Sequence, residues 1–189
     1  MSHVVLFHSA LGLRPAVRDF AAQLAADGHQ VTTPDLFDGE VFDDLALGVK
    51  KRDALGIEEL SRRARAAVEG LPADVVYAGF SMGAAAAQAL ALTRPGARGV
   101  VLMHAVLPLV AFGATAWPAE LRGQIHTSVE DPWVDLTVAR AMAASATDRL
   151  QLFEYAGSAH LFADAAHADF DEAHAAAMTE RVRAFSKGA

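Results

Sequence analysis

The sequence predicts an α/β fold: a mostly parallel central sheet of about six strands, covered by helices on both faces. Two observations lead to this prediction. Short apolar runs alternate along the chain with longer segments of helical periodicity. Strands this apolar are expected to be buried on both faces, as in a parallel sheet covered by helices. The length of 189 residues suits one domain spanning residues 1–189.

The elements follow from these patterns in order. Strands are expected at residues 4–7, 31–33, 75–78, 99–103, 124–128 and 150–155. Helices are expected at residues 15–26, 57–68, 82–93, 134–144 and 170–185. Gly28 marks the end of the first helix, because glycine tolerates the left-handed conformation of a helix cap. Residues 37–56 hold five acidic residues and three glycines, and we expect a long loop there. It is either a lid or pocket wall, or a solvated loop.

Composition limits the classes of function. Hydrophobic residues make up 53% of the chain and charged residues 21%, which argues against disorder. The net charge of -7 argues against nucleic-acid binding. There are no cysteines, so disulfides and thiolate metal sites are excluded. No signal peptide or membrane-length apolar run is present, and we expect a cytoplasmic protein that does not bind a membrane.

A nucleophile motif lies between an expected strand and an expected helix. Residues 79–83, Gly-Phe-Ser-Met-Gly, match the pattern G-x-S-x-G. This strand–turn–helix setting is the one that a nucleophile elbow requires, and it predicts that Ser81 is a nucleophile. The helix N-terminus behind Ser81 offers free N–H groups to a developing oxyanion. The alternative is a glycine-rich turn whose serine only caps the helix.

A serine needs a base, and the base needs an orienting acid. His160 follows the expected strand 150–155, at the sheet edge where ligand-binding groups gather, and is the predicted base. Asp131 is the favoured acid because Asp-Pro opens a turn that fixes the carboxylate. Glu130 and Asp135 are the rival acids. The backbone N–H groups of Ala10 and Met82 are the predicted oxyanion donors.

Other side chains are candidates for the substrate pocket, with ordinary packing as the alternative for each. These candidates are His8, Leu11, His104, Trp133, Phe162 and Asp164. His167, Asp171 and His174 have the spacing of one face on the expected last helix, as a metal site would need. We favour a solvated polar stripe there, and predict neither a metal nor a cofactor.

The chain resembles the dienelactone hydrolase family over nearly its whole length. The resemblance rests on residues 7–13, 28–36, 79–83, 130–134 and 155–162. It implies an α/β-hydrolase fold that lacks the first two strands, a triad of Ser81, Asp131 and His160, and hydrolysis of a small ester or lactone through an acyl-enzyme. A non-catalytic α/β-hydrolase-like protein that binds a small molecule is the alternative. A metal-assisted hydrolase that uses the last helix is a second rival.

Three positions depart from the pattern of the best-known members of the family. Ser81 stands where they have a cysteine nucleophile, and Ser9 where they have a glutamate. Asp164 stands where they have an arginine that binds a substrate carboxylate. The last change predicts a preference for neutral or cationic substrates, because like charges repel.

Overall fold

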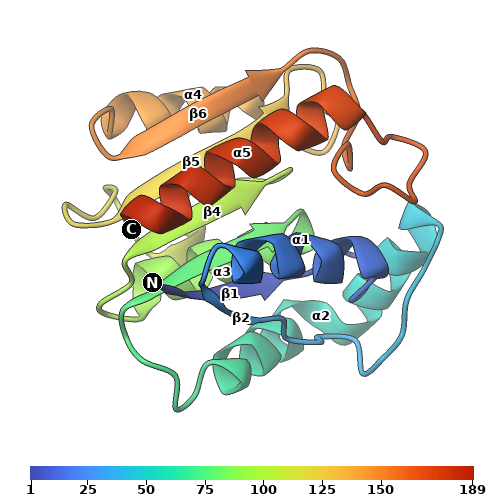
Figure 1. Ribbon diagram of the computed structural model, residues 1–189, viewed down its shortest axis with the longest axis horizontal. Helices are drawn as coiled ribbons and strands as arrows, with labels where there is room; N and C mark the ends of the chain where they lie inside the picture. Colours follow the sequence, from blue (N-terminus) through green and yellow to red (C-terminus); the bar gives the residue numbers. More distant parts are fainter.

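The computed structural model describes residues 1–189 and is built on one six-stranded sheet (Figure 1). Its strands are β1 (His3–Phe7), β2 (Gln30–Thr32), β3 (Val75–Phe80), β4 (Gly99–Met103), β5 (Arg122–Ser128) and β6 (Leu150–Tyr155). Their order is β2-β1-β3-β4-β5-β6, and every neighbouring pair is parallel. The predicted fold class is therefore confirmed, with a sheet that is parallel throughout.

Five helices cover the two faces of this sheet. They are α1 (Pro15–Ala26), α2 (Leu45–Ala67), α3 (Met82–Thr93), α4 (Leu136–Ser145) and α5 (Glu172–Gly188), and a short 3-10 turn η1 covers Leu109–Phe112. Helices α1 and α5 lie on one face, and α2, α3 and α4 on the other (Figure 1). Each face buries its own apolar cluster, so the apolar strands are covered on both sides as the sequence predicted.

The strand order creates a crevice at one edge of the sheet. From β1 the chain passes to β2 on one side, and β3 then pairs with β1 on the other side, with Phe7 opposite Gly79. Connections that leave neighbouring parallel strands in opposite directions open a crevice at the carboxyl ends of those strands. The loop after β1 and the turn after β3 both lie at this point, which places Ser81 in the crevice.

Helix α2 differs from the sequence prediction. It begins at Leu45 instead of residue 57, and the Asp44 carboxylate caps it by accepting the Leu47 N–H at 3.0 Å. The expected loop of residues 37–56 is thus helical over its second half. At Gly56 the backbone takes φ 78° and ψ 160°, and this kink divides α2 into residues 45–55 and 57–67. Only a glycine adopts this φ without strain.

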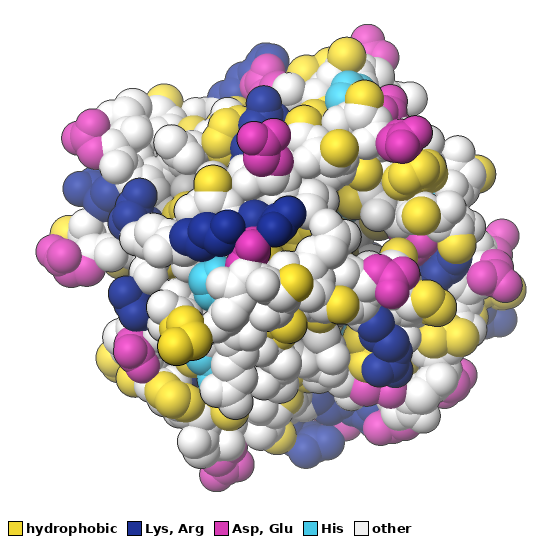
Figure 2. Space-filling model, in the orientation of Figure 1, with side chains coloured by type: hydrophobic (Ala, Val, Ile, Leu, Met, Phe, Trp, Pro, Cys, Tyr) yellow, Lys and Arg dark blue, Asp and Glu magenta, His cyan; other side chains and the backbone are white.

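The other helices lie close to their predicted bounds. Helix α4 begins two residues later than expected, after Asp135 caps it by accepting the N–H groups of Thr137 and Val138. Helix α5 begins at Glu172 after the cap residue Asp171, so His167 lies outside the helix. None of the helices is both long and apolar enough to span a membrane. On the face shown in Figure 2, acidic and basic side chains are interspersed without a large patch of either sign.

Candidate active site

Ser81 lies on a strained turn between β3 and α3. Its backbone has φ 51° and ψ -113°, a conformation that non-glycine residues rarely adopt. The Ser81 N–H donates to the Met103 carbonyl at 2.7 Å, which ties the turn to the neighbouring strand β4. A Cβ at Gly83 would lie 2.5 Å from the carbonyl oxygens of Phe7 and His8, so only glycine lets α3 approach β1 this closely. The turn therefore has the geometry of a nucleophile elbow.

His160 and Asp131 continue from Ser81 in a chain of hydrogen bonds. The Ser81 Oγ lies 2.8 Å from His160 Nε2, and His160 Nδ1 lies 2.7 Å from Asp131 Oδ2. The His160 and Asp131 side chains are only 4% and 0% exposed. Because ionised Asp131 can only accept, Nδ1 carries the proton and Nε2 is free to accept from the serine hydroxyl.

The carboxylate of Asp131 is itself held in place. Its second oxygen, Oδ1, accepts the Trp133 N–H at 2.9 Å. The rival acids lie elsewhere: Glu130 is exposed and Asp135 caps α4. The structure thus brings Asp131, alone among the three candidate acids, into contact with His160.

Two backbone N–H groups near Ser81 have no partner in the protein. The Ala10 N–H lies in the loop after β1 and makes no hydrogen bond to backbone or side chain. Met82 is the first residue of α3, and the first N–H groups of a helix lack intrahelical acceptors. Around Ala10 the loop is fixed by the Ser9 hydroxyl, which accepts the Leu11 N–H at 3.1 Å. Both predicted donors are therefore free.

His8 holds this loop by a hydrogen bond to the Ser9 carbonyl. Its Nε2 accepts the Leu36 N–H at 2.9 Å, so Nδ1 carries the proton and donates to the Ser9 carbonyl at 2.6 Å. Burial lowers the pKa of His8, which favours this neutral form. His8 is fully buried and faces backbone groups, which corrects its expected place in the substrate pocket.

A cleft of about 670 Å³ opens from Ser81 and His160 and runs between α2 and α3. Of the six expected pocket residues, Trp133 lines this cleft and the other five do not. Leu11 and Phe162 are fully buried in the protein interior. Both were expected to line the substrate pocket, but their apolar side chains lie in the core.

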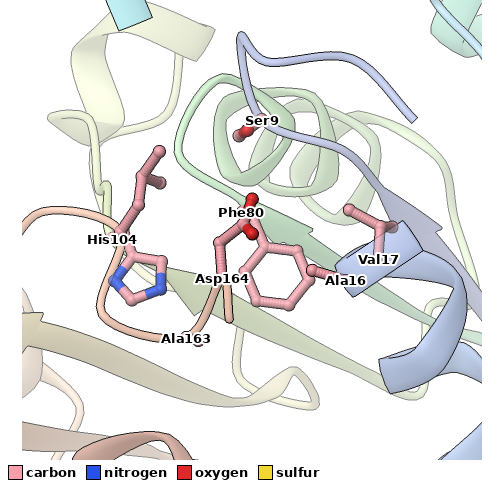
Figure 3. Close-up of a pocket in the computed structure, with 8 residues that line it drawn as sticks. Ser9, Ala16, Val17, Phe80, His104, Ala163 and Asp164 are labelled. Carbon is pink, nitrogen blue, oxygen red and sulfur yellow. The ribbon is translucent and has the colours of Figure 1, made fainter. Parts of the chain in front are cut away.

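His104 and Asp164 line a different and much smaller cavity. It has a volume of about 20 Å³, enough for one water molecule, and Figure 3 shows Phe80 and Ser9 beside them. The Asp164 carboxylate is paired with Arg14, with 3.3 Å between Arg14 Nε and Asp164 Oδ2. The expectation that Asp164 faces a substrate is corrected by this pairing, and the charge preference derived from it loses its basis.

His104, which lines the small cavity, is a buried histidine without hydrogen-bonding partners. It is fully buried with φ 63°, and neither ring nitrogen has a hydrogen-bonding partner in the protein. Its ring packs edge-on against Phe162, with 4.4 Å between ring centroids. Burial, with a smaller effect from the nearby His160, holds the pKa of His104 well below its usual range, so this imidazole is neutral.

The stripe considered as a metal site does not form one helical face. His167 precedes α5, and Asp171 is the cap residue whose carboxylate accepts the His174 N–H at 3.0 Å. No group of three or more histidine, aspartate or glutamate side chains in the structure is arranged to hold a metal ion. The three residues do not share one helix, because α5 begins five residues after His167.

One contributor to the site was not predicted. Asp169 Oδ2 accepts the backbone N–H groups of His160, at 2.9 Å, and of Leu161, at 3.2 Å, and so fixes the loop that carries His160. No motif marks Asp169 in the sequence. The start of α2 at Leu45 was also missed, because residues 45–56 were expected to be a loop. The residues after Gly56, which supply most of the α2 side of the cleft, lie in the predicted helix 57–68.

Comparison with known proteins identifies the family of the chain. The model of the dienelactone hydrolase family matches residues 1–188. The chain belongs to this family. The recognised resemblance is thereby confirmed, and membership of the dienelactone hydrolase family supports hydrolase activity. A search of curated proteins finds no match.

Solved structures of α/β hydrolases share the fold of this dienelactone hydrolase family member. A dienelactone hydrolase-like promiscuous phosphotriesterase from metagenomic libraries has a TM-score of 0.79 at 21% identity, over 100% of this chain and 86% of that one. A metagenome-derived lipolytic enzyme has a TM-score of 0.66 at 19% identity, over 99% and 94% of the chains. An esterase domain from Rhodothermus marinus has a TM-score of 0.63 at 15% identity, over 99% and 87%.

Proposed function

We propose that the protein hydrolyses a small carboxylic ester or lactone through an acyl-enzyme. Ser81 is the nucleophile, His160 the general base and Asp131 the acid that orients it. The observation that carries the proposal is the unbroken series of contacts from Ser81 Oγ to His160 Nε2, at 2.8 Å, and from His160 Nδ1 to Asp131, at 2.7 Å. Nucleophile and base in hydrogen-bond reach, with a third group orienting the base, are what serine activation requires.

The first half of the reaction forms the acyl-enzyme. Ser81 Oγ attacks the carbonyl carbon while its proton moves to His160 Nε2. The N–H groups of Ala10 and Met82 bind the oxyanion of the tetrahedral intermediate. As the intermediate collapses, the bond to the leaving oxygen breaks and His160 returns the proton to it. Asp131 stabilises the imidazolium that exists between these two transfers.

The second half releases the acid. A water molecule gives its proton to His160 Nε2 and attacks the acyl carbonyl, and the oxyanion is bound by the same two N–H groups. Collapse breaks the bond to Ser81 Oγ, which recovers its proton from His160. For a lactone the leaving oxygen stays attached to the acyl group, so hydrolysis gives one hydroxy acid.

Covalent labelling tests the proposal. A fluorophosphonate probe should label the protein at Ser81 alone, and Ser81→Ala should abolish both labelling and hydrolysis of p-nitrophenyl esters and lactones. Ser145 is an exposed serine on α4, and Ser145→Ala is the matched control that should retain both properties. Labelling that persists in Ser81→Ala would overturn the assignment. Absence of labelling and turnover in the wild type would favour the non-catalytic alternative.

A further inference from the structure

Helix α3 has an apolar face that the sheet does not cover. The side chains of Ala84 and Ala87 are fully buried against the sheet. Met82, Ala85 and Ala89 are only partly buried, and the helical spacing of 82, 85 and 89 places them on one face. A helix face turned to water is ordinarily polar. This one is apolar, with two alanines among its three residues, and it lines the cleft at Ser81.

Helix α2 forms the opposite wall of this cleft, mostly with residues that follow its kink at Gly56. Leu60 and Ala64 line it from that side, and Thr93 lies at its far end. The cleft is lined along α3 from Met82 to Thr93, twelve residues. The eleven steps between them correspond to about 16 Å at the helical rise per residue. Its volume of about 670 Å³ lies within the range of small-molecule sites. The cleft is thus long, and one of its ends is at the proposed nucleophile.

The charges along the cleft balance. Two bases, Arg52 and Arg65, and two acids, Asp53 and Glu58, line it from α2. Arg52 Nε donates to its neighbour Asp53 at 2.8 Å, so one pair is already internally satisfied. With no excess of either sign, the cleft has no net charge with which to select a charged ligand. Thirteen of its 22 lining residues are hydrophobic, so its selectivity is expected to be for apolar surface.

Large apolar side chains are exposed at the mouth of the cleft. Ile57 is 84% exposed and Trp133 is 52% exposed, and both line it. Trp133 also packs against His160, with 5.7 Å between ring centroids. Exposed apolar groups that surround an apolar groove are typical of a ligand site, because binding removes them from water.

We propose that this groove binds an unbranched hydrocarbon chain of the ester, on either its acyl or its alcohol side. The proposal rests on the proposed function, since the groove starts at Ser81. The alanines on α3 leave the room that the chain occupies, and Leu60 and Ile57 cover it from α2. The substrate class is therefore a neutral ester with a linear apolar chain.

Two series of esters test the proposal. One series keeps p-nitrophenol and lengthens the acyl chain from acetate to octanoate, and the other keeps acetate and lengthens the alcohol from methyl to octyl. In one of the two, kcat/KM should rise roughly two- to fourfold per added CH₂, since about 0.8 kcal/mol per buried CH₂ corresponds to fourfold. Chains that bind along α3 should show this gain, and the series that responds identifies the side that occupies the groove.

Variants of α3 test whether the hydrocarbon chain of the substrate lies in the groove. Ala89→Leu fills the distal part and Ala85→Leu a part nearer Ser81. Ala89→Leu should lower the ratio of octyl-chain to two-carbon kcat/KM by about tenfold or more, because overpacking is costly. Ala85→Leu should lower kcat/KM relative to the two-carbon ester already at shorter chain lengths than Ala89→Leu does. Ala141→Leu, at an exposed position on α4 outside the cleft, is the control and should leave the ratio unchanged.

The outcomes separate this proposal from the proposed function. Hydrolysis of acetate esters that depends on Ser81, with no gain from chain length in either series, overturns the groove and leaves the hydrolase assignment in place. Loss of fluorophosphonate labelling and of all turnover in the wild type overturns the proposed function itself. If a leucine variant fails to fold in a thermal melt, the wild-type chain-length series still decides.

Discussion

Asp169 Oδ2 accepts the backbone N–H of His160 at 2.9 Å, nine residues away along the chain. The same oxygen accepts the Leu161 N–H at 3.2 Å. A carboxylate that receives two backbone donors fixes the direction of the loop. Asp169 therefore acts on the proposed chemistry through the position of His160 and does not contact Ser81 or the substrate cleft.

Removing this carboxylate should slow turnover. We expect Asp169→Ala to lower kcat about tenfold with little change in KM, because proton transfer depends on the placement of the imidazole whereas the substrate cleft is untouched. Asp169→Asn keeps one acceptor oxygen and should restore most of kcat. The measurement is steady-state ester hydrolysis, with a thermal melt for each variant. Equal losses in both variants would contradict a positioning role.

The orienting acid is tested by comparing neighbouring carboxylates. Asp131→Asn should lower kcat by about a thousandfold or more, because the amide no longer selects the productive tautomer of His160. Glu130→Gln is the matched control at the adjacent, exposed position and should stay within about twofold of the wild type. If Glu130→Gln is the more damaging change, the acid has been misassigned.

Asp164 should contribute to stability and not to substrate charge preference. Its partner Arg14 is 6% exposed at its side chain, so Asp164→Asn leaves a buried guanidinium short of its counter-charge. Arg14 keeps its bond to the Phe42 carbonyl, and we expect a loss of about 2–3 kcal/mol in the free energy of unfolding, measured with urea.

The control for this change uses the same arginine. Asp43 also faces Arg14, at 3.5 Å, but is fully exposed, so Asp43→Asn should leave stability nearly unchanged. In Asp164→Asn the ratio of kcat/KM for a neutral ester to that for its carboxylate analogue should match the wild type. A shift of several-fold in this ratio would show that Asp164 reaches the substrate after all.

Acid should destabilise the protein through His126. This residue is buried between Gln124 and Tyr155, whose hydroxyl accepts from Arg181 at 3.0 Å and lies 2.9 Å from His126 Nδ1. Burial, with a smaller effect from Arg181, lowers the pKa of His126 from 6.5 to about 3. Between these values the unfolded chain binds a proton that the folded protein does not, so the free energy of unfolding falls as the pH falls below 6.5.

The change His126→Gln isolates this contribution. The slope of the unfolding free energy between pH 5.5 and 4.5 should decrease by about 1.4 kcal/mol per pH unit relative to the wild type. His174→Gln, at a more exposed imidazole on α5, controls for the loss of a histidine. An unchanged slope in His126→Gln would mean that this residue is protonated in the folded protein over that range.

The sheet and the elbow could be predicted because local chemistry determines them. Short, strongly apolar runs indicated buried parallel strands, and the glycines around Ser81 marked a turn in which larger side chains do not fit. The first half of α2 could not be predicted, because Gly48 disfavours a helix locally. In the structure a Cβ at Gly48 would clash with the Ala10 carbonyl, so glycine is required there by a contact distant in sequence.

The candidate site shows the same division. Ser81, Asp131 and His160 each follow a strand at one edge of the sheet, and topology brings such positions together. Of the expected pocket residues only Trp133 lines the cleft, because a position near the site does not say which way a side chain points. The His8 side chain bonds to the Ser9 carbonyl, and the Asp164 carboxylate pairs with Arg14. Both orientations depend on partners outside the motifs.

The kink at Gly56 separates two halves of α2 that contact different parts of the protein. The half that contains Gly48 packs on the Ala10 loop, where the proposed oxyanion donor is held. The half that contains Leu60 and Ala64 packs on the α3 side of the core and walls the cleft. Because the Ala10 contact lies before Gly56, replacements after Gly56 would reshape the cleft while that contact stays in place. Among proteins with this fold, sequence changes that alter the substrate range would then be concentrated in residues 57–64. The position of the proposed oxyanion donor in the Ala10 loop would stay the same.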